Sequence, residues 1–240
     1  MKKFIKNLIL GALIVAVCFS VNIGTVMATT AVYSGTYTAP YCSSNASPCE
    51  TGSTVANSIV RGRLTIGPEP NYSNTVNTCN DGGTGVYHSD ESIDMLKLEK
   101  SGGGAFTSGS SVRVVATVWC FGTTNDYIEI YYGGNVNSPS FGTPIYSTTC
   151  PATGQQTITS SYFTLTSSAV NQIIRAQFNY SAAGGSNSCL TGNYNDRDDL
   201  VFKAVNAAPQ CVGPTSIING RTYYRDSNGN YNYILATDLL

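Results

Sequence analysis

The feature that most constrains the fold is a strict two-residue alternation between Val112 and Trp119. One set of alternate positions in this stretch is apolar throughout: Val112, Val114, Ala116 and Val118. Successive side chains of a β-strand point to opposite faces of a sheet, so this period indicates a strand with one buried face. No comparable stretch with a helical period of 3.6 residues follows the N-terminal segment.

Similar β-branched and aromatic runs recur along the chain with turn residues between them. Strands are predicted within residues 59–66, 93–98, 112–119, 127–132, 144–148, 157–165, 173–180 and 200–205. About eight strands in one domain favour two packed antiparallel sheets. The predicted fold is therefore an all-β, antiparallel two-sheet sandwich of jelly-roll type that spans residues 29–205.

The segment after residue 205 is predicted to be a separate C-terminal extension, residues 206–240. Asn219-Gly220 and Asn228-Gly229 are strong hairpin turn signals. The runs beside them, 216–218, 221–225 and 231–235, are expected to form a small meander. Such a meander has little core of its own and would need to dock on the sandwich or on a partner.

Residues 1–28 are predicted to be a signal peptide. Lys2, Lys3 and Lys6 precede an apolar run from Leu8 to Val21, and Val26-Met27-Ala28 supplies a cleavage site. The apolar run is shorter than the roughly 20 residues that a membrane-spanning helix needs. The expected location is therefore extracellular or periplasmic, with no membrane insertion after cleavage.

The charge balance argues against a nucleic-acid partner. The chain has 13 basic and 14 acidic residues, and removal of the three leader lysines leaves 10 basic against 14 acidic, a net charge of −4. Nucleic acids and anionic membrane surfaces require basic patches. The hydrophobic content of 42% and the 16 tyrosines are typical of a folded domain.

The cysteines predict a disulfide framework, because export favours oxidation. Cys42 and Cys49 bracket a short polar loop and are expected to pair. The other predicted bridges are Cys79–Cys189, in two Gly/Asn-rich loops, and Cys120–Cys150, on either side of the 127–132 strand. Cys211 is then left over at the start of the tail and could link to a partner.

The catalytic motifs point away from an enzyme. His88 is the single histidine, and the sequence contains neither a G-x-S-x-G nor an H-E-x-x-H motif. A loop-structuring hydrogen bond or a ligand contact is expected of His88 rather than a general-base role. Paired carboxylates suited to glycoside cleavage remain an open alternative.

Acidic residues are concentrated in two segments, which predicts a structural calcium site. One segment contains Asp81, Asp90, Glu91 and Asp94, and the other lies just before the last predicted strand. Calcium takes six to eight oxygen ligands, which loops supply easily. The predicted metal ligands are Asp90, Glu91, Asp94, Asp196, Asp198 and Asp199, with Asp196 and Asp198 the most natural pair because alternate strand residues share a face. The alternative is that these are solvated loop acids.

Loop tyrosines suggest a binding surface, since a planar ring can stack on a sugar while its hydroxyl makes hydrogen bonds. The candidates are Tyr72, Tyr87, Tyr146, Tyr162, Tyr180 and Tyr194. Ordinary amphipathic packing is the alternative for these rings. Trp119, at the end of the alternating strand, is expected in the core.

Several segments together resemble an accessory β-sandwich module that follows the catalytic domain in some secreted bacterial peptidases, both trypsin-like and metallo-aminopeptidase types. The segments are Cys42–Cys49, Gly67–Asn71, Tyr87–Ser92, Val114–Trp119 and Tyr194–Phe202. The resemblance covers roughly Tyr33 to Val205 and implies a non-catalytic domain that binds an extracellular substrate or surface. The sequence departs from that pattern at Arg197, where similar sequences often carry His, in the tail after Val205, and in containing no peptidase domain.

The sequence therefore predicts a secreted, non-catalytic binding or accessory module that recognises an extracellular glycan or protein surface. A hydrolase or lyase that uses paired carboxylates is the first alternative. A structural or adhesive surface protein, linked through Cys211 or the tail, is the second.

Overall fold

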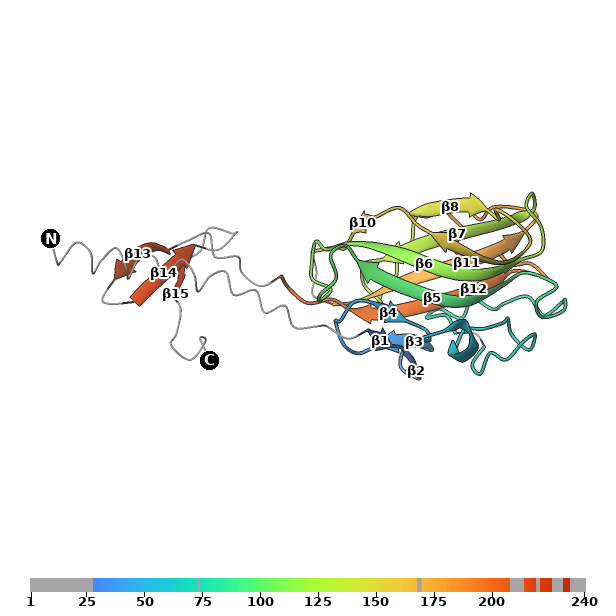
Figure 1. Ribbon diagram of the computed structural model, residues 1–240, viewed down its shortest axis with the longest axis horizontal. Coiled ribbons are helices and arrows are strands. Elements are labelled where there is room, and N and C mark those ends of the chain that lie inside the picture. The colour runs from blue at the N-terminus through green and yellow to red at the C-terminus, as the bar shows by residue number, and fades with distance from the viewer. Residues whose placement is uncertain are drawn as a thin grey trace. The chain divides into compact units, whose positions relative to one another are not determined.

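The computed structural model describes residues 28–207 except Ser73 and residues 168–169, together with the backbone of three tail strands. These residues belong to two units, divided between Asn206 and Ala207. The first unit is a sandwich of two six-stranded sheets, seen as two layers in Figure 1. The predicted all-β sandwich is confirmed. Among the described residues, no helix is long and apolar enough to cross a membrane.

The first sheet is built around the long hairpin of β5 and β6. Its strand order is β1-β4-β5-β6, and both β9 and β10 pair with β6. The strands are β1 (Thr29–Thr30), β4 (Cys49–Glu50), β5 (Ser92–Lys100), β6 (Ser111–Cys120), β9 (Gly154–Thr159) and β10 (Phe163–Thr164). A short 3-10 helix, η1 (Val55–Asn57), lies between β4 and β5.

The second sheet has the order β2-β3-β12-β11-β7-β8. Its strands are β2 (Val32–Ser34), β3 (Ala39–Cys42), β7 (Asp126–Gly133), β8 (Tyr146–Thr149), β11 (Asn171–Tyr180) and β12 (Asp196–Lys203). Strand β11 runs antiparallel to both β7 and β12 over eight residue pairs with each, so it forms the centre of the sheet.

The core lies between the sheets and follows the predicted alternation. Val112, Val114, Ala116 and Val118 of β6 are all buried. Facing them from the second sheet are buried residues of β11 and β12, including Ile174, Phe178, Leu200 and Phe202. Trp119 was expected in the core, but it is half-buried and stacks on His88 with ring centroids 4.3 Å apart.

Two details of the predicted topology are corrected. The sheets are mixed rather than purely antiparallel, because β1 pairs with β4 and β3 pairs with β12 in parallel. Residues 59–66 form no strand, since Gly62 and Leu64 adopt positive φ angles of 111° and 49° that turn the backbone. The strand order does not establish the jelly-roll connectivity, which stays a prediction.

All three predicted disulfides are present: Cys42–Cys49, Cys79–Cys189 and Cys120–Cys150. Three disulfides suggest an oxidising, extracellular or periplasmic environment. Cys211 and residues 1–27 of the predicted signal peptide lie outside the described residues.

The second unit contains the predicted meander. Strands β13 (Pro214–Ile218), β14 (Arg221–Arg225) and β15 (Tyr231–Tyr233) form a three-stranded sheet in which each neighbouring pair is antiparallel. The two predicted Asn-Gly turns lie outside the described residues.

Candidate metal centre

The second acidic segment, Asp196–Asp199, lies inside strand β12, not in the loop before it. Strand β12 begins at Asp196. Alternation therefore places Asp196 and Asp198 on the same face as the core residues Leu200 and Phe202, and Asp199 on the opposite face. Both carboxyl groups are buried, with Asp196 fully inaccessible and Asp198 only 1% exposed.

The loop between η1 and β5 adds three more oxygen-bearing side chains to this place. The Asn74 amide nitrogen donates to Glu69 Oε1 and to Asp198 Oδ1. The backbone N–H of Arg197 donates to Asp81 Oδ1 at 3.0 Å. The carboxyl cluster is therefore defined by Glu69, Asn74, Asp81, Asp196 and Asp198.

The Cys79–Cys189 disulfide anchors this loop to the segment that joins β11 and β12. The backbone supports the anchor, because Asp199 N–H donates to the Asn74 carbonyl at 3.3 Å and Gly82 N–H donates to the Asn195 carbonyl at 2.8 Å. The predicted tethering of the two acidic segments by this disulfide is thus present in the structure.

Each of the five side chains in the carboxyl cluster has one buried oxygen without a hydrogen-bond partner. These atoms are Glu69 Oε2, Asn74 Oδ1, Asp81 Oδ2, Asp196 Oδ1 and Asp198 Oδ2. A buried polar atom without a partner costs about 1–3 kcal/mol, and more when it is charged. The cluster therefore has five oxygens with unused hydrogen-bonding capacity, four of them from carboxyl groups.

The pKa values of the carboxyl groups in the cluster are all raised, because burial disfavours their ionised forms. Burial, reinforced by Asp196 and Asp81, raises the pKa of Glu69 to about 10. Burial raises the pKa of Asp81 to about 6, although Arg197 and Arg63 act in the opposite direction. Burial and the neighbouring carboxyls also raise the pKa of Asp196 and of Asp198 well above the usual value.

Two arginines lie near the cluster but direct hydrogen bonds elsewhere. Arg63 donates to the carbonyl oxygens of Asn193 and Thr84 at 3.3 and 2.8 Å. Arg197 donates to the carbonyl oxygens of Asn80 and Leu190. Four carboxyl groups therefore share two guanidinium groups that donate hydrogen bonds to backbone carbonyls.

The donor set is made of oxygen atoms alone, which calcium prefers over zinc. In the part of the chain that the structure describes, no three His, Cys, Asp or Glu side chains already form a metal-binding arrangement. Calcium would therefore have to draw the five oxygens together, with displacement of the Asn74 amide from its present hydrogen bonds.

The six predicted ligands are divided among four places. Asp196 and Asp198, the pair singled out by strand alternation, lie in the carboxyl cluster. Asp199 forms a buried ion pair with Arg175, Nε to Oδ1 at 2.7 Å. Asp94 accepts from Ser92 at 3.0 Å and lies 2.9 Å from His88 Nε2. Asp90 and Glu91 belong to a surface cavity described below.

His88 has the loop-structuring hydrogen bond that its position suggested. Its ring stacks between Tyr87 and Trp119, with centroid distances of 3.8 and 4.3 Å. The bond to Asp94 and the two rings together fix the loop where it enters β5.

Glu69 and Asn74 were not among the predicted ligands, and Asp81 had been noted only as part of the first acidic segment. A usable signal was present for Glu69, because its Gly-Pro-Glu-Pro context marks a fixed loop that carries an isolated acid. For Asn74 no sequence signal separates it from the other loop asparagines.

No protein-family model matches the chain, and no curated protein matches it significantly.

Proposed function

We propose that this protein is a secreted, non-catalytic binding module whose sandwich is stabilised by calcium in the carboxyl cluster. The observation that carries the calcium proposal is the set of five buried oxygens without partners. The binding role draws on the resemblance to accessory peptidase modules and on an aromatic-lined cavity at the surface. The proposed ligand is an extracellular glycan or protein surface.

Calcium would perform one task here, which is charge compensation. Glu69, Asp81, Asp196 and Asp198 come from a loop and from a strand, so a cation bound by all four would fix the loop against the sheet. A ligand that binds the native state alone stabilises it by about 2.7 kcal/mol at a hundredfold excess over Kd.

A hydrolase that uses paired carboxylates is the second candidate, because a raised pKa is what a general acid requires. Against it, none of the four carboxyl groups of the cluster lines either of the two surface cavities described below. The burial of these four carboxyl groups favours a structural role over a catalytic one.

The calcium proposal is tested by thermal melts of the purified protein in millimolar calcium and in EGTA, with elemental analysis of untreated protein. We expect a higher Tm in calcium and about one equivalent of bound calcium. Asp198→Asn should abolish the difference, whereas Glu99→Gln, which removes a carboxylate at the surface, should retain it. Coincident melts with no bound calcium would refute the site.

The binding role is tested separately by a screen of extracellular glycans and proteins, run with and without chelator. The non-catalytic role is tested with casein and general peptide substrates, on which we expect no turnover. Turnover that disappears in a folded His88→Ala variant would contradict it.

A further inference from the structure

A second group of carboxyl side chains lies beside three aromatic rings at the surface of the sandwich. Asp90, Glu91, Phe121, Tyr180 and Tyr194 line a cavity of about 110 Å³. These residues come from the loop before β5, the end of β6, the end of β11 and the loop before β12. We call this cavity the aromatic cavity.

The rings form one continuous wall. Tyr180 and Tyr194 meet edge to face with centroids 5.5 Å apart, and Phe121 meets Tyr180 in the same way at 6.3 Å. Phe121 is 52% exposed, so its ring is held at the surface instead of packing into the core. The surface loop that carries Phe121 is fixed by Asp126, whose Oδ2 accepts the N–H groups of Phe121 and Gly122 at 2.7 and 2.8 Å.

The carboxyl side of the aromatic cavity has unused hydrogen-bonding capacity. Glu91 is only 1% exposed, yet its Oε1 has no hydrogen-bond partner. Oδ1 of the neighbouring Asp126 is likewise buried without a partner. Asp90 uses Oδ2 to accept the Val86 N–H at 2.6 Å, which positions its carboxyl group at the cavity.

Arg63 is the cation that acts on Glu91, and its hydrogen bonds go to the carbonyls of Asn193 and Thr84. Its guanidinium carbon lies 5.9 Å from the centroid of the Tyr194 ring. Because Arg63 also acts on Asp81 and Asp196 of the carboxyl cluster, the site formed by Asp90, Glu91 and Asp126 has an excess of negative charge when these groups are ionised.

Aromatic faces and carboxylates together recognise a cation. A ring attracts a cation through its quadrupole, and a carboxylate adds a charge-assisted hydrogen bond. Ligand pockets for drug-sized molecules occupy about 300–1,000 Å³, so a cavity of about 110 Å³ suits one charged headgroup and not a chain of sugar rings.

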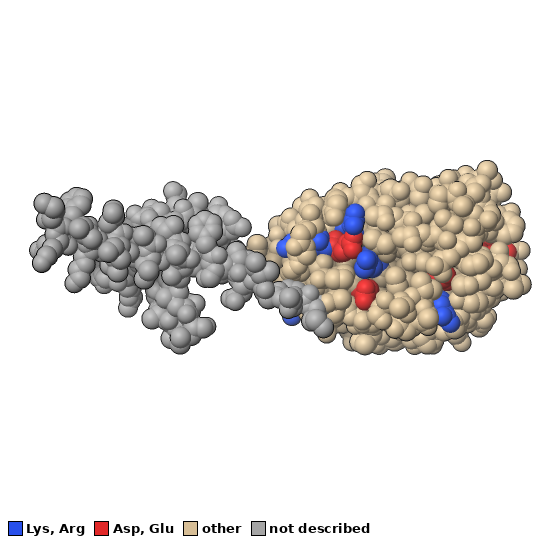
Figure 2. Space-filling view, viewed as in Figure 1, with Lys and Arg blue, Asp and Glu red and all other residues tan. Residues whose placement is uncertain are grey.

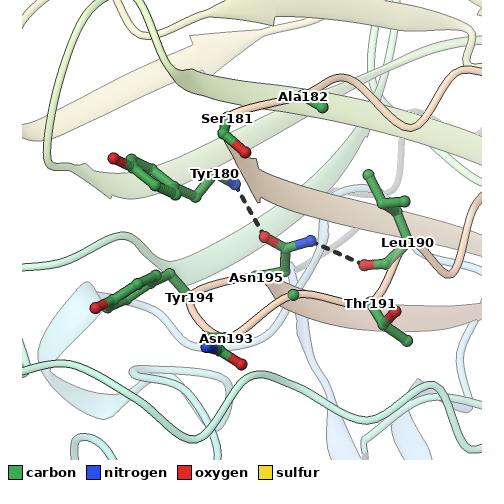
Figure 3. A pocket seen from close by; sticks show the side chains of 9 residues that line it. Tyr180, Ser181, Ala182, Leu190, Thr191, Asn193, Tyr194 and Asn195 are labelled. Carbon is green, nitrogen blue, oxygen red and sulfur yellow. Dashed lines mark hydrogen bonds between the residues drawn. The ribbon is translucent and has the colours of Figure 1, made fainter.

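A larger cavity of about 330 Å³ adjoins the first through Tyr180 and Tyr194, which line both. Figure 3 shows the two rings side by side, with Asn195 between the strand end and the 190–195 loop. Asn195 braces both walls, because its Oδ1 accepts the Tyr180 N–H and its Nδ2 donates to the Leu190 carbonyl, both at 2.9 Å. The Leu190–Asn195 loop forms one side of this larger cavity.

We propose that the aromatic cavity binds an Arg or Lys side chain of an extracellular polypeptide, whose backbone lies in the adjoining cavity. This inference rests on the proposed binding role and names the ligand class and the site for it. Figure 2 shows that basic and acidic side chains are few on the face in view and that most of them lie together in one mixed group.

The test is a titration of the purified protein at low salt with N-acetyl-arginine amide and N-acetyl-lysine amide, followed by NMR. N-acetyl-citrulline amide is the matched neutral probe, and glucosamine and N-acetylglucosamine represent a glycan source. We expect binding of the two cationic probes, with citrulline at least tenfold weaker. Equal binding of citrulline, no binding of either cationic probe, or preferred binding of the sugars would overturn the proposal.

Variants locate the site. Glu91→Gln keeps the shape of the side chain and Tyr194→Ala removes a ring, and each should weaken the arginine probe roughly tenfold. Tyr162→Ala is the control, since Tyr162 is 49% exposed but lines neither cavity. Loss of the probe in Tyr162→Ala, or its retention in both site variants, would contradict this assignment.

The outcome of the arginine-probe titration can be distinguished from the outcome of the glycan and protein screen that tests the proposed function. If the glycan and protein screen yields a ligand that Glu91→Gln still binds, the binding role stands and this site does not. If the screen yields no ligand while the arginine probe binds at the aromatic cavity, the cation site is supported. The part of the proposal that names an extracellular polypeptide as the ligand is then refuted.

Discussion

The carboxyl group of Asp196 on β12 accepts a hydrogen bond from the backbone N–H of Ile93 on β5, at 2.5 Å. The bond joins the two sheets, because β12 and β5 belong to opposite layers of the sandwich. It coincides with an irregularity in the pairing of β5 with β6, where the register shifts between Ile93 and Met95. A side chain of the second sheet therefore satisfies an N–H group at the point where the first sheet is irregular.

This bond predicts different results for two substitutions of Asp196. Asp196→Ala leaves the Ile93 N–H buried without a partner and should cost about 1–3 kcal/mol of unfolding free energy in EGTA, and more in calcium because it also removes a ligand. Asp196→Asn retains an oxygen acceptor and removes one of four crowded carboxyl groups. In EGTA it should therefore be at least as stable as the natural protein, and in calcium it should be less stable.

Urea unfolding of both variants, in calcium and in EGTA, measures these four differences. If Asp196→Asn were as damaging as Asp196→Ala in EGTA, crowding of the carboxyl groups would not be the source of the high pKa values, and the case for a cation would weaken.

The disulfides should differ in their contributions to stability. In the chain-entropy model the stabilisation grows with the length of the closed loop, and Cys79–Cys189 closes a separation of 110 residues against 30 for Cys120–Cys150 and 7 for Cys42–Cys49. Replacement of Cys79 and Cys189 by Ala should cost about 4–5 kcal/mol, the largest loss of the three.

The same double variant should also bind calcium more weakly, because the disulfide holds the loop that carries Asn74 and Asp81. Replacement of Cys120 and Cys150 serves as the control and should leave the calcium midpoint unchanged. Equal calcium midpoints in the two double variants would show that the loop is held without the disulfide.

The sequence predicted the sandwich, the long strands and the disulfides because these depend on local signals. Alternation at Val112–Val118 is visible in the sequence itself. Export favours disulfide formation, and the positions of the cysteines in the chain suggested which of them pair. It did not predict the parallel pairing of β3 with β12, because two short segments, 160 residues apart, carry no pattern that names a partner.

The carboxyl cluster shows the same limit at the scale of a site. Alternation within β12 correctly joined Asp196 with Asp198 and separated Asp199. The remaining members of the cluster depend on which loop lies above the end of that strand, so Asp90, Glu91 and Asp94 were grouped by sequence proximity, while Glu69 and Asn74 were overlooked. Proximity in sequence is a poor guide where a loop of more than 30 residues folds back over the sheet.

Asp199 is expected to be essential for the fold and unrelated to calcium. Its oxygens accept from Arg175 Nε at 2.7 Å and from the second guanidinium nitrogen at 2.8 Å, and both side chains are fully buried. Removal of one partner from a buried ion pair costs about 3–5 kcal/mol, since the other charge is left uncompensated.

Asp199→Asn should therefore lower the Tm strongly, by the same amount in calcium and in EGTA. Glu99→Gln, which breaks an exposed pair with Arg113, should change the Tm little. If the decrease in Tm caused by Asp199→Asn depended on calcium, Asp199 would have to be considered a calcium ligand again.

Glu91 provides a pH test of the aromatic cavity. Burial, followed by the negative charges of Asp126 and Asp90, raises its pKa to about 7, although its own backbone N–H and Arg63 act in the opposite direction. The unfolded chain loses this proton near pH 4.5, whereas the folded protein retains it to about pH 7. The folded state therefore binds more protons between these values, so the contribution of Glu91 to stability falls as pH rises from about 4.5 to about 7 and is constant above that.

Glu91→Gln removes this contribution without a change of side-chain shape. The difference in unfolding free energy between the variant and the natural protein should shift in favour of the variant as pH rises from about 4.5 to 7, and then level off. Urea unfolding at half-unit pH intervals in EGTA measures it, and Glu99→Gln is the control, because the pKa of Glu99 is lowered and its contribution has the opposite sign.

A difference that does not change with pH would mean that Glu91 titrates normally and that the aromatic cavity already contains the compensation its carboxyl group requires. Addition of the arginine probe should reduce the slope, since a bound cation favours the ionised carboxylate and is held more tightly as Glu91 loses its proton.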